Sequence, residues 1–399
     1  MTRNQTGNKI RNQPSNVSIR RVSNLLDGRV GYQVKSCWGH ISVLEGGGHI
    51  CELNLNDCDG VNPLWRPPWK TIDPYNYAEK HFRIYGPPPD GRLLAGIAGH
   101  SLSFDYFGPP SKEEIAAGHS THGEAPSVKW NFKRATVDSS STLRGSAFLP
   151  EAQIKLARQI VVDPRKPAIY CQETAANLSS FDRPISWNEH VTFGPPFLEP
   201  NTTLFDMPAT RAKTSPLSYS AQSLVKSDAE FVWPIAPGSR GGRLNLRTVP
   251  DKKFGQYTAQ LLDPKLKIGF IAACNPRLGL LVVYAFRRAE FPWVGNWVES
   301  SLRSHAPWNR KAFCRGIEFS TTPFAIPRRE TIEQNRLFGE SVYCWLPAKS
   351  QASVRYMILM FHVPADFRGV KSVSLDGSAT ITERGASPRK LAIRIKKFL

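Results

Sequence analysis

Short apolar segments separated by glycine and proline run through most of this 399-residue chain. Two of them, IGFIAAC at 268–274 and LLVVYAF at 280–286, are apolar at consecutive positions rather than at alternate ones. Such runs suit strands that are covered on both faces. The 32 prolines and 29 glycines favour many short strands joined by turns over long helices. The sequence therefore predicts an all-β protein with few short helices.

The remaining segments fit one large antiparallel β-sandwich of the supersandwich type. Alternating apolar positions on both sides of Gly46-Gly47-Gly48 predict a hairpin. A single short helix is expected at 111–117, and the stretch 291–330 reads as loop-rich. Further strands are predicted at 128–132, 153–162, 168–177, 256–262, 267–275, 342–346, 355–362, 370–375 and 390–397. We find no linker that would split the chain, so we expect a polar, flexible tail at 1–28 and one domain at 29–399.

Composition narrows the classes of function. No stretch is long and apolar enough to cross a membrane, and the polar N-terminus lacks the apolar core of a secretion signal. The seven cysteines are scattered and form no C-x-x-C pair, which argues against a zinc site or a disulfide framework and for a cytoplasmic protein. The net charge of +19 is dispersed and carries no nucleic-acid motif. We expect no metal, membrane or nucleic-acid partner, and the oligomeric state stays open.

Polar, titratable and aromatic residues gather in three segments that we place on loops. They are THGEA at 121–125, WNEHVTFGPPF at 187–197 and RGIEFSTTPF at 315–324. Functional residues concentrate on loops and strand ends that a rigid scaffold holds in place. These three segments are therefore the candidate site.

The same segments, in the same order, resemble the aldose 1-epimerase superfamily, also called galactose mutarotase-like. A His-Gly element is followed by Asn-x-His leading to Phe-Gly-Pro, and then by Gly-Ile-Glu ahead of a proline. The early glycine-rich hairpin and Asp90-Gly91-Arg92 fit as well. The resemblance covers roughly residues 30–380 and is closer to the divergent members of the superfamily.

The resemblance implies an isomerase that interconverts sugar anomers without a cofactor. His190 matches the acid that protonates the ring oxygen, and Glu318 matches the base that deprotonates the anomeric hydroxyl. His122 matches a second histidine that holds the substrate, and Arg92 matches an arginine that contacts sugar hydroxyls. The family's additional sugar-binding aspartate has no clear counterpart; Asp228, Asp251 and Asp263 are candidates.

The residues themselves leave structural alternatives open. His190 lies among Trp187, Val191 and Phe193, where a histidine can be a structural residue. Simple alternation with Ile317 and Phe319 would turn Glu318 to solvent, whereas a strand covered on both faces would hold its carboxyl group inside. Trp297, next to Gly295 and Asn296, is expected on a loop at the rim of the cleft as a platform for a sugar ring.

Three functions remain after this reading. The first is a mutarotase-type epimerase acting on a free hexose or a related sugar. The second is a carbohydrate-binding or sensor protein without catalysis. The third is an enzyme that acts on an anionic or polymeric sugar. The positive net charge supports this third function, and a long open groove lined by Arg and Lys would favour it. For the first, we expect His190 and Glu318 on opposite sides of one cleft, a sugar's width apart.

Overall fold

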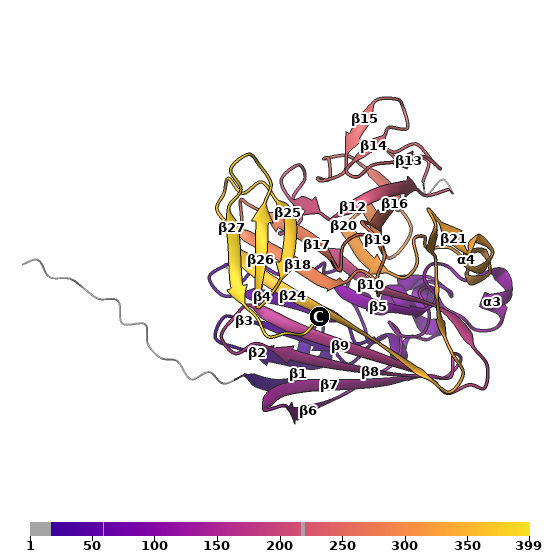
Figure 1. The fold of residues 1–399 in the computed structure, drawn as a ribbon. Helices are drawn as coiled ribbons and strands as arrows, with labels where there is room; N and C mark the ends of the chain where they lie inside the picture. The colour runs from indigo at the N-terminus through magenta and orange to yellow at the C-terminus, as the bar shows by residue number, and fades with distance from the viewer. Residues whose placement is uncertain (1–16, 59, 217–219) are drawn as a thin grey trace, which may run out of the picture.

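Two large antiparallel sheets pack face to face in the computed structural model, which describes residues 17–58, 60–216 and 220–399 (Figure 1). One sheet has twelve strands, in the order β1-β2-β3-β4-β5-β10-β20-β19-β16-β12-β13, with β23 paired to β10 off this path. Its strands are β1 (Ser18–Leu26), β2 (Arg29–Lys35), β3 (Gly39–Leu44), β4 (Ile50–Leu55), β5 (His100–Asp105), β10 (Arg183–Phe193), β12 (Ala209–Thr214), β13 (Glu230–Phe231), β16 (Phe254–Leu262), β19 (Trp293–Ser300), β20 (Phe313–Ser320) and β23 (Cys344–Leu346).

The second large sheet has eight strands, in the order β11-β17-β18-β24-β9-β8-β7-β6. These are β6 (Asn131–Val137), β7 (Ser140–Leu149), β8 (Ile154–Val162), β9 (Ala168–Asn177), β11 (Leu204–Asp206), β17 (Ile268–Asn275), β18 (Leu280–Arg287) and β24 (Gln351–His362). The predicted large antiparallel sandwich is confirmed.

Smaller elements complete the described part of the chain. A three-stranded sheet is formed by β25 (Val370–Leu375), β26 (Ser378–Glu383) and β27 (Lys390–Arg394). Two-stranded ribbons pair β14 (Ile235–Pro237) with β15 (Arg243–Asn245), and β21 (Arg336–Leu337) with β22 (Glu340–Ser341). The helices are short: η1 (Pro74–Asn76), η2 (Glu79–His81), α1 (Phe82–Tyr85), α2 (Gly91–Gly96), α3 (Lys112–Ala116) and α4 (Arg328–Gln334). None of the described helices is long and apolar enough to cross a membrane.

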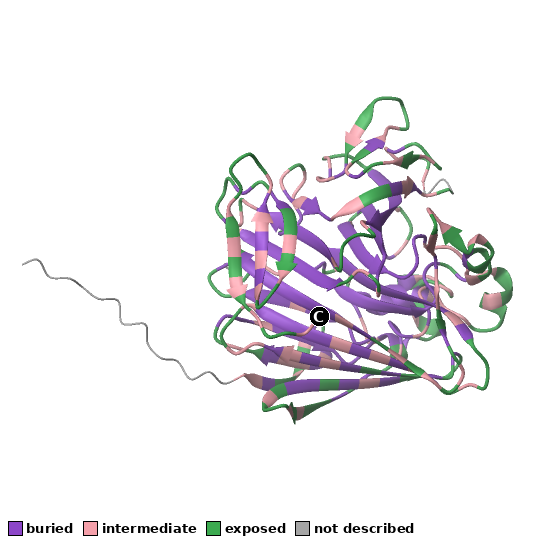
Figure 2. Cartoon of the chain, in the orientation of Figure 1, coloured by how far each residue is buried: buried purple, intermediate pink, exposed green. Residues whose placement is uncertain are grey.

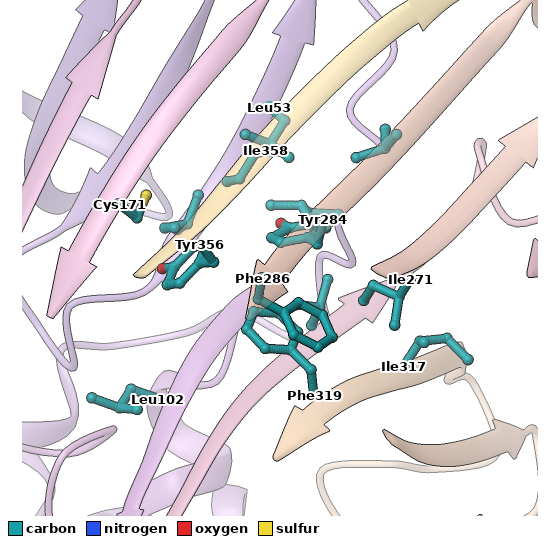
Figure 3. Packing of buried hydrophobic residues seen from close by; sticks show 14 of the residues in the cluster. Leu53, Leu102, Cys171, Ile271, Tyr284, Phe286, Ile317, Phe319, Tyr356 and Ile358 are labelled. Carbon is teal, nitrogen blue, oxygen red and sulfur yellow. The ribbon is translucent and has the colours of Figure 1, made fainter. Parts of the chain in front are cut away.

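The main core lies between the two large sheets (Figure 2). Figure 3 shows side chains from both sheets meeting there, among them Phe286 of β18 and Phe319 of β20. These two rings stack with their centroids 4.4 Å apart and their planes within 10°. Burying an aromatic side chain of this size contributes about 1.5–3 kcal/mol. Phe319 therefore fixes β20 firmly against the opposite sheet.

Both large sheets are also covered on their outer faces. The C-terminal sheet packs on the eight-stranded sheet, where Ala379 and Ile381 join a cluster with residues of β17, β18 and β24. This second cover explains why the runs at 268–274 and 280–286 are apolar at consecutive positions. On the outer face of the twelve-stranded sheet, α2 and several loops cover Tyr257 and Trp297. That outer layer contains the candidate site.

Several segments that were predicted as loops or as a flexible tail are strands. The segments 187–197 and 315–324, expected on loops, lie in large part on the central strands β10 and β20. The supposedly loop-rich 291–330 also contains β19. Their polar residues, tryptophans and glycines resemble a loop composition, but each strand is buried on both faces. Within the expected tail at 1–28, Ser18–Leu26 forms β1 and pairs with β2, while residues 1–16 lie outside the described residues.

Candidate active site

A cavity of about 430 Å³ opens on the outer face of the twelve-stranded sheet. Strands β10, β16, β19 and β20 form its floor, and α2 together with loops near residues 107–122, 303–308 and 324–326 forms its walls. The volume falls in the range of about 300–1,000 Å³ that is usual for small-molecule sites. Its polar and charged lining residues are Asp90, Thr121, His122, His190, Ser215, Tyr257, Arg303, His305 and Glu318.

Strand register brings His190 beside Glu318 on the cavity floor. The pairing of β10 with β20 joins Asn188 to Ser320 and Thr192 to Gly316, which sets His190 across from Glu318. Nε2 of His190 lies 3.3 Å from Oε1 of Glu318. Both side chains are almost fully buried. Two residues that are 128 positions apart in the numbering thus become neighbours through one strand pair.

Two glycines make room for the carboxyl group of Glu318. Gly295 is paired with Glu318 across the β19–β20 ladder, and Gly316 precedes it by two positions on the same face of β20. A Cβ atom on Gly316 would lie 2.5 Å from Oε1 of Glu318, and one on Gly295 would lie 2.2 Å from the Tyr257 hydroxyl. Any larger residue at these positions would press against the Glu318 carboxyl group or the Tyr257 hydroxyl.

Burial sets the protonation state of Glu318. Because the carboxyl group is removed from water, its pKa rises to about 8. Asn188 opposes this by directing Nδ2 toward Oε2 at 3.5 Å, a distance that is long for a hydrogen bond. Ile317 and Phe319 face the main core on the other side of β20. The strand is therefore covered on both faces, and Glu318 points into the cavity layer rather than to bulk solvent.

His190 is held as a neutral imidazole. Burial lowers its pKa well below the ordinary value of 6.5, and the neighbouring His122 lowers it further. Nδ1 lies 3.0 Å from Oγ1 of Thr192. When the Glu318 carboxyl group carries a proton, it can donate toward Nε2, which leaves the Nδ1 hydrogen to be donated to Thr192. Thr192 then fixes both the orientation and the tautomer of the ring.

His122 approaches from a loop on the opposite wall. Its backbone has φ +65°, and Gly123 follows at φ +75°, so this turn needs a residue that tolerates the left-handed region. The Gly108 N–H donates to Nδ1 of His122 at 3.1 Å, which places the ring hydrogen on Nε2. Burial lowers the pKa of His122 to about 4, and the positive charge of Arg303 adds to this. The His122 ring meets His190 edge to face at 5.3 Å.

Aromatic side chains form the remaining wall. Trp297 lies on β19, with its ring 5.8 Å from His190 and 6.2 Å from Trp308. The Arg303 guanidinium lies 4.6 Å from the centre of the Trp308 ring and 3.3 Å from Glu299. Aromatic faces of this kind offer apolar area to the C–H side of a ligand. The expected rim loop around Trp297 was wrong, because 293–300 is a buried central strand.

The overall architecture matches solved structures at low sequence identity. A candidate aldose 1-epimerase from Klebsiella pneumoniae superposes with a TM-score of 0.62 at 14% identity, covering 85% of this chain and 81% of that one. A galactose mutarotase-like protein from Clostridium acetobutylicum superposes with a TM-score of 0.57 at 14% identity, covering 87% of this chain and 99% of that one. A second candidate aldose 1-epimerase, from Escherichia coli, superposes with a TM-score of 0.52 at 10% identity, covering 87% of this chain and 100% of that one. No family model and no curated protein matches the sequence.

The chain has the galactose mutarotase-like fold. Within that fold, His122, His190, Trp297 and Glu318 converge on one cavity, as the lining shows. Arg92 does not: it is exposed on α2 and is absent from the residues that line the cavity. Arg92 was predicted from the resemblance at Asp90-Gly91-Arg92, and of the two charged residues of that motif it is Asp90, the residue before α2, that lines the cavity. Asp228, Asp251 and Asp263 line neither the cavity nor its walls.

The expected placement of the pair was also wrong. His190 and Glu318 are not on opposite sides of the cleft but in contact on its floor. Sequence reasoning further missed Asp90, Tyr257, Arg303 and Trp308, which reach the cavity from four different segments. Only the Asp90-Gly91-Arg92 motif gave a signal for any of them. Among the described residues, no group of three His, Cys, Asp or Glu side chains is placed to hold a metal ion.

Proposed function

We propose that this protein is a mutarotase-type isomerase that interconverts the anomers of a sugar with a free anomeric hydroxyl. The observation that carries the proposal is the contact of 3.3 Å between Nε2 of His190 and Oε1 of Glu318 on the floor of a sugar-sized cavity. The mutarotase-like fold supports it, although a fold alone does not establish an activity.

Contact between the two groups suits this chemistry better than separation does. Anomer exchange delivers a proton to the ring oxygen and removes one from the anomeric hydroxyl. Both oxygens are bonded to the same carbon, so the acid and the base have to work side by side. A pair that spans the whole sugar could reach only one of the two oxygens.

The pair holds the one proton that the reaction needs. With the pKa of Glu318 raised and that of His190 lowered, the resting pair is a carboxylic acid next to a neutral imidazole. Transfer of the proton within the pair produces imidazolium and carboxylate, the acid and base expected from the family resemblance. The two groups therefore titrate together.

The steps balance without an added reactant. His190 gives its proton to the ring oxygen while Glu318 takes the proton of the anomeric hydroxyl. The bond between the anomeric carbon and the ring oxygen breaks, and an open-chain aldehyde forms. Rotation about the adjacent carbon–carbon bond presents the other face of the aldehyde, and the reverse transfers close the ring. Each positioned group contributes about 10²–10⁴-fold to such a reaction.

The cavity walls supply the binding contacts in this proposal. The Nε2 hydrogen of neutral His122 is a donor for a sugar hydroxyl, because Nδ1 is already occupied by Gly108. The Trp297 ring provides an apolar face beside His190. Asp90 adds an acceptor at the N-terminal end of α2.

A screen of free sugars tests the proposal directly. Freshly dissolved single anomers of hexoses and their acidic derivatives are followed by saturation-transfer NMR with the wild-type protein, with Glu318→Gln and with Glu79→Gln, an exposed control. We expect the wild type and the control to accelerate equilibration and Glu318→Gln to be at least about 100-fold slower. Binding of a sugar without any acceleration would assign the protein instead to non-catalytic carbohydrate binding.

A further inference from the structure

A second and larger cleft adjoins the candidate active site. It has a volume of about 830 Å³ and shares Ser215 and Tyr257 with the smaller cavity. The end of β12, the stretch 220–227, the turn at 238–241 and the residues just before β16 enclose it. The two hollows therefore adjoin each other at Ser215 and Tyr257, on the same side of the molecule as His190 and Glu318.

The chemistry of this cleft differs from that of the cavity. Arg240, Lys252 and Lys253 line it, all three are exposed, and none of the residues named in its lining is acidic. In the described part of the chain, no carboxylate lies within ion-pair distance of these three cations. The uncompensated charge thus points toward an anionic ligand.

Hydroxyl and amide groups accompany the cations. The lining includes Thr214, Gln222 and five serines, namely Ser215, Ser220, Ser223, Ser227 and Ser239. Thr214, Ser220, Ser223, Ser227 and Ser239 already donate their hydroxyl hydrogens to backbone carbonyl groups. Their oxygens can still accept hydrogen bonds, so what these side chains offer to the hydroxyl groups of a sugar chain is acceptors. The cations come from two separate segments, 240 and 252–253, so they suit charges that are spread along a ligand rather than gathered at one point.

We propose that this cleft binds the anionic continuation of an oligosaccharide whose reducing-end sugar occupies the cavity. The inference rests on the proposed function, because it assigns the cavity to the sugar that bears the free anomeric hydroxyl. It makes the substrate class an acidic oligosaccharide, with carboxylates facing Arg240, Lys252 and Lys253. The cleft is about twice the volume of the cavity, which leaves room for further sugar units beyond the first.

Charge-matched variants isolate the role of the cleft. One variant combines Arg240→Ala, Lys252→Ala and Lys253→Ala. Its control combines Lys133→Ala, Arg144→Ala and Lys155→Ala, which removes the same charges from exposed positions on β6, β7 and β8. Binding of trigalacturonate, maltotriose and free galacturonic acid is measured by calorimetry at low and high salt, and anomer exchange is measured by NMR in parallel.

We expect the wild type to bind trigalacturonate more tightly than maltotriose, and this preference to shrink as salt screens the charges. The cleft variant should bind trigalacturonate about tenfold more weakly, and the control should bind it as the wild type does. Equal binding of the charged and neutral trisaccharides, or a preference that survives in the cleft variant, overturns the inference. A third outcome is charge-dependent binding without anomer exchange for any of the sugars. That outcome refutes the proposed catalysis and leaves the cleft assignment standing.

Discussion

His190 and Glu318 face each other across the β10–β20 strand pair, with Nε2 3.3 Å from Oε1. The neighbouring residues Val191 and Phe319 point to the other face of these strands and anchor both strands in the sandwich core. The distance between His190 and Glu318 is therefore set by strand register rather than by flexible loops. A rigid floor of this kind holds catalytic groups within the narrow geometry that proton transfer needs.

The first prediction concerns the pH dependence of anomer exchange. The active pair carries one proton, which it loses as the pH rises through the raised pKa of Glu318, about 8. We therefore expect the exchange rate to be level near neutral pH and to fall above about pH 8. Equilibration of a single sugar anomer, followed between pH 5 and 10, measures this. A rate that keeps rising to pH 10 would contradict a protonated resting pair.

The second prediction concerns the space around the Glu318 carboxyl group. Gly316→Ala places a methyl group 2.5 Å from Oε1, so the carboxyl group has to shift. We expect exchange to slow by about 100-fold, since displacement by roughly 1 Å can cost that much. Exchange by NMR and the melting temperature are measured together.

Gly145→Ala is the matched control for this substitution. Gly145 is also a buried strand glycine, on β7, and its added Cβ would meet the Phe132 ring, outside the cavity lining. Overpacking there typically costs about 1–3 kcal/mol of stability. We expect Gly145→Ala to lower the melting temperature while retaining exchange. Equal activity losses in both variants would show that Gly316 acts only through stability.

The third prediction separates binding from turnover at His122. His122→Asn keeps an acceptor for the Gly108 N–H and tolerates positive φ, but it lacks the Nε2 hydrogen. We expect KM to rise about tenfold, the cost of about one hydrogen bond, with kcat changed much less. His119→Asn, outside the cavity lining and paired with Glu151, is the control. A loss confined to kcat would place His122 in the chemical step instead.

The sequence was informative where burial alone decides structure. The strand at 168–177 was predicted with its observed bounds, and the doubly apolar runs marked strands covered on both faces. Alternation and turn residues are local signals, so a single sequence suffices to read them. The convergence of His122, His190 and Glu318 came from motif order, not from periodicity.

The contact geometry of the site could not be read in this way. β10, β19 and β20 looked like loops because they carry Asn188, Gly295 and Glu318 at buried positions, which local propensity disfavours in strands. Their pairing partners lie up to about 130 residues away, and strand register over such separations is a tertiary property. Arg92 failed for a different reason: it was placed by its motif alone, and a motif does not show which residue at the start of α2 faces the cavity.

The last prediction concerns stability, and it follows from the cost of burying a carboxyl group. In the folded protein the pKa of Glu318 is about 8, above its ordinary value of 4.5. Between these values the folded state binds more protons than the unfolded state, so the free energy of unfolding decreases as the pH rises. A tenfold change in an acid's ionisation constant corresponds to about 1.4 kcal/mol, so the decrease amounts to a few kcal/mol in total.

Glu318→Gln removes this dependence because the amide does not titrate. We expect the variant to gain stability relative to the wild type as the pH rises from 5 to 8, as measured by urea unfolding at each pH. Buried Glu173, whose pKa burial raises to about 7, is present in both proteins and cancels in the difference. The exposed control Glu79→Gln should track the wild type. A difference between Glu318→Gln and the wild type that stays constant with pH would mean that Glu318 is ionised in the folded protein, and the one-proton pair would then be the wrong description of this site.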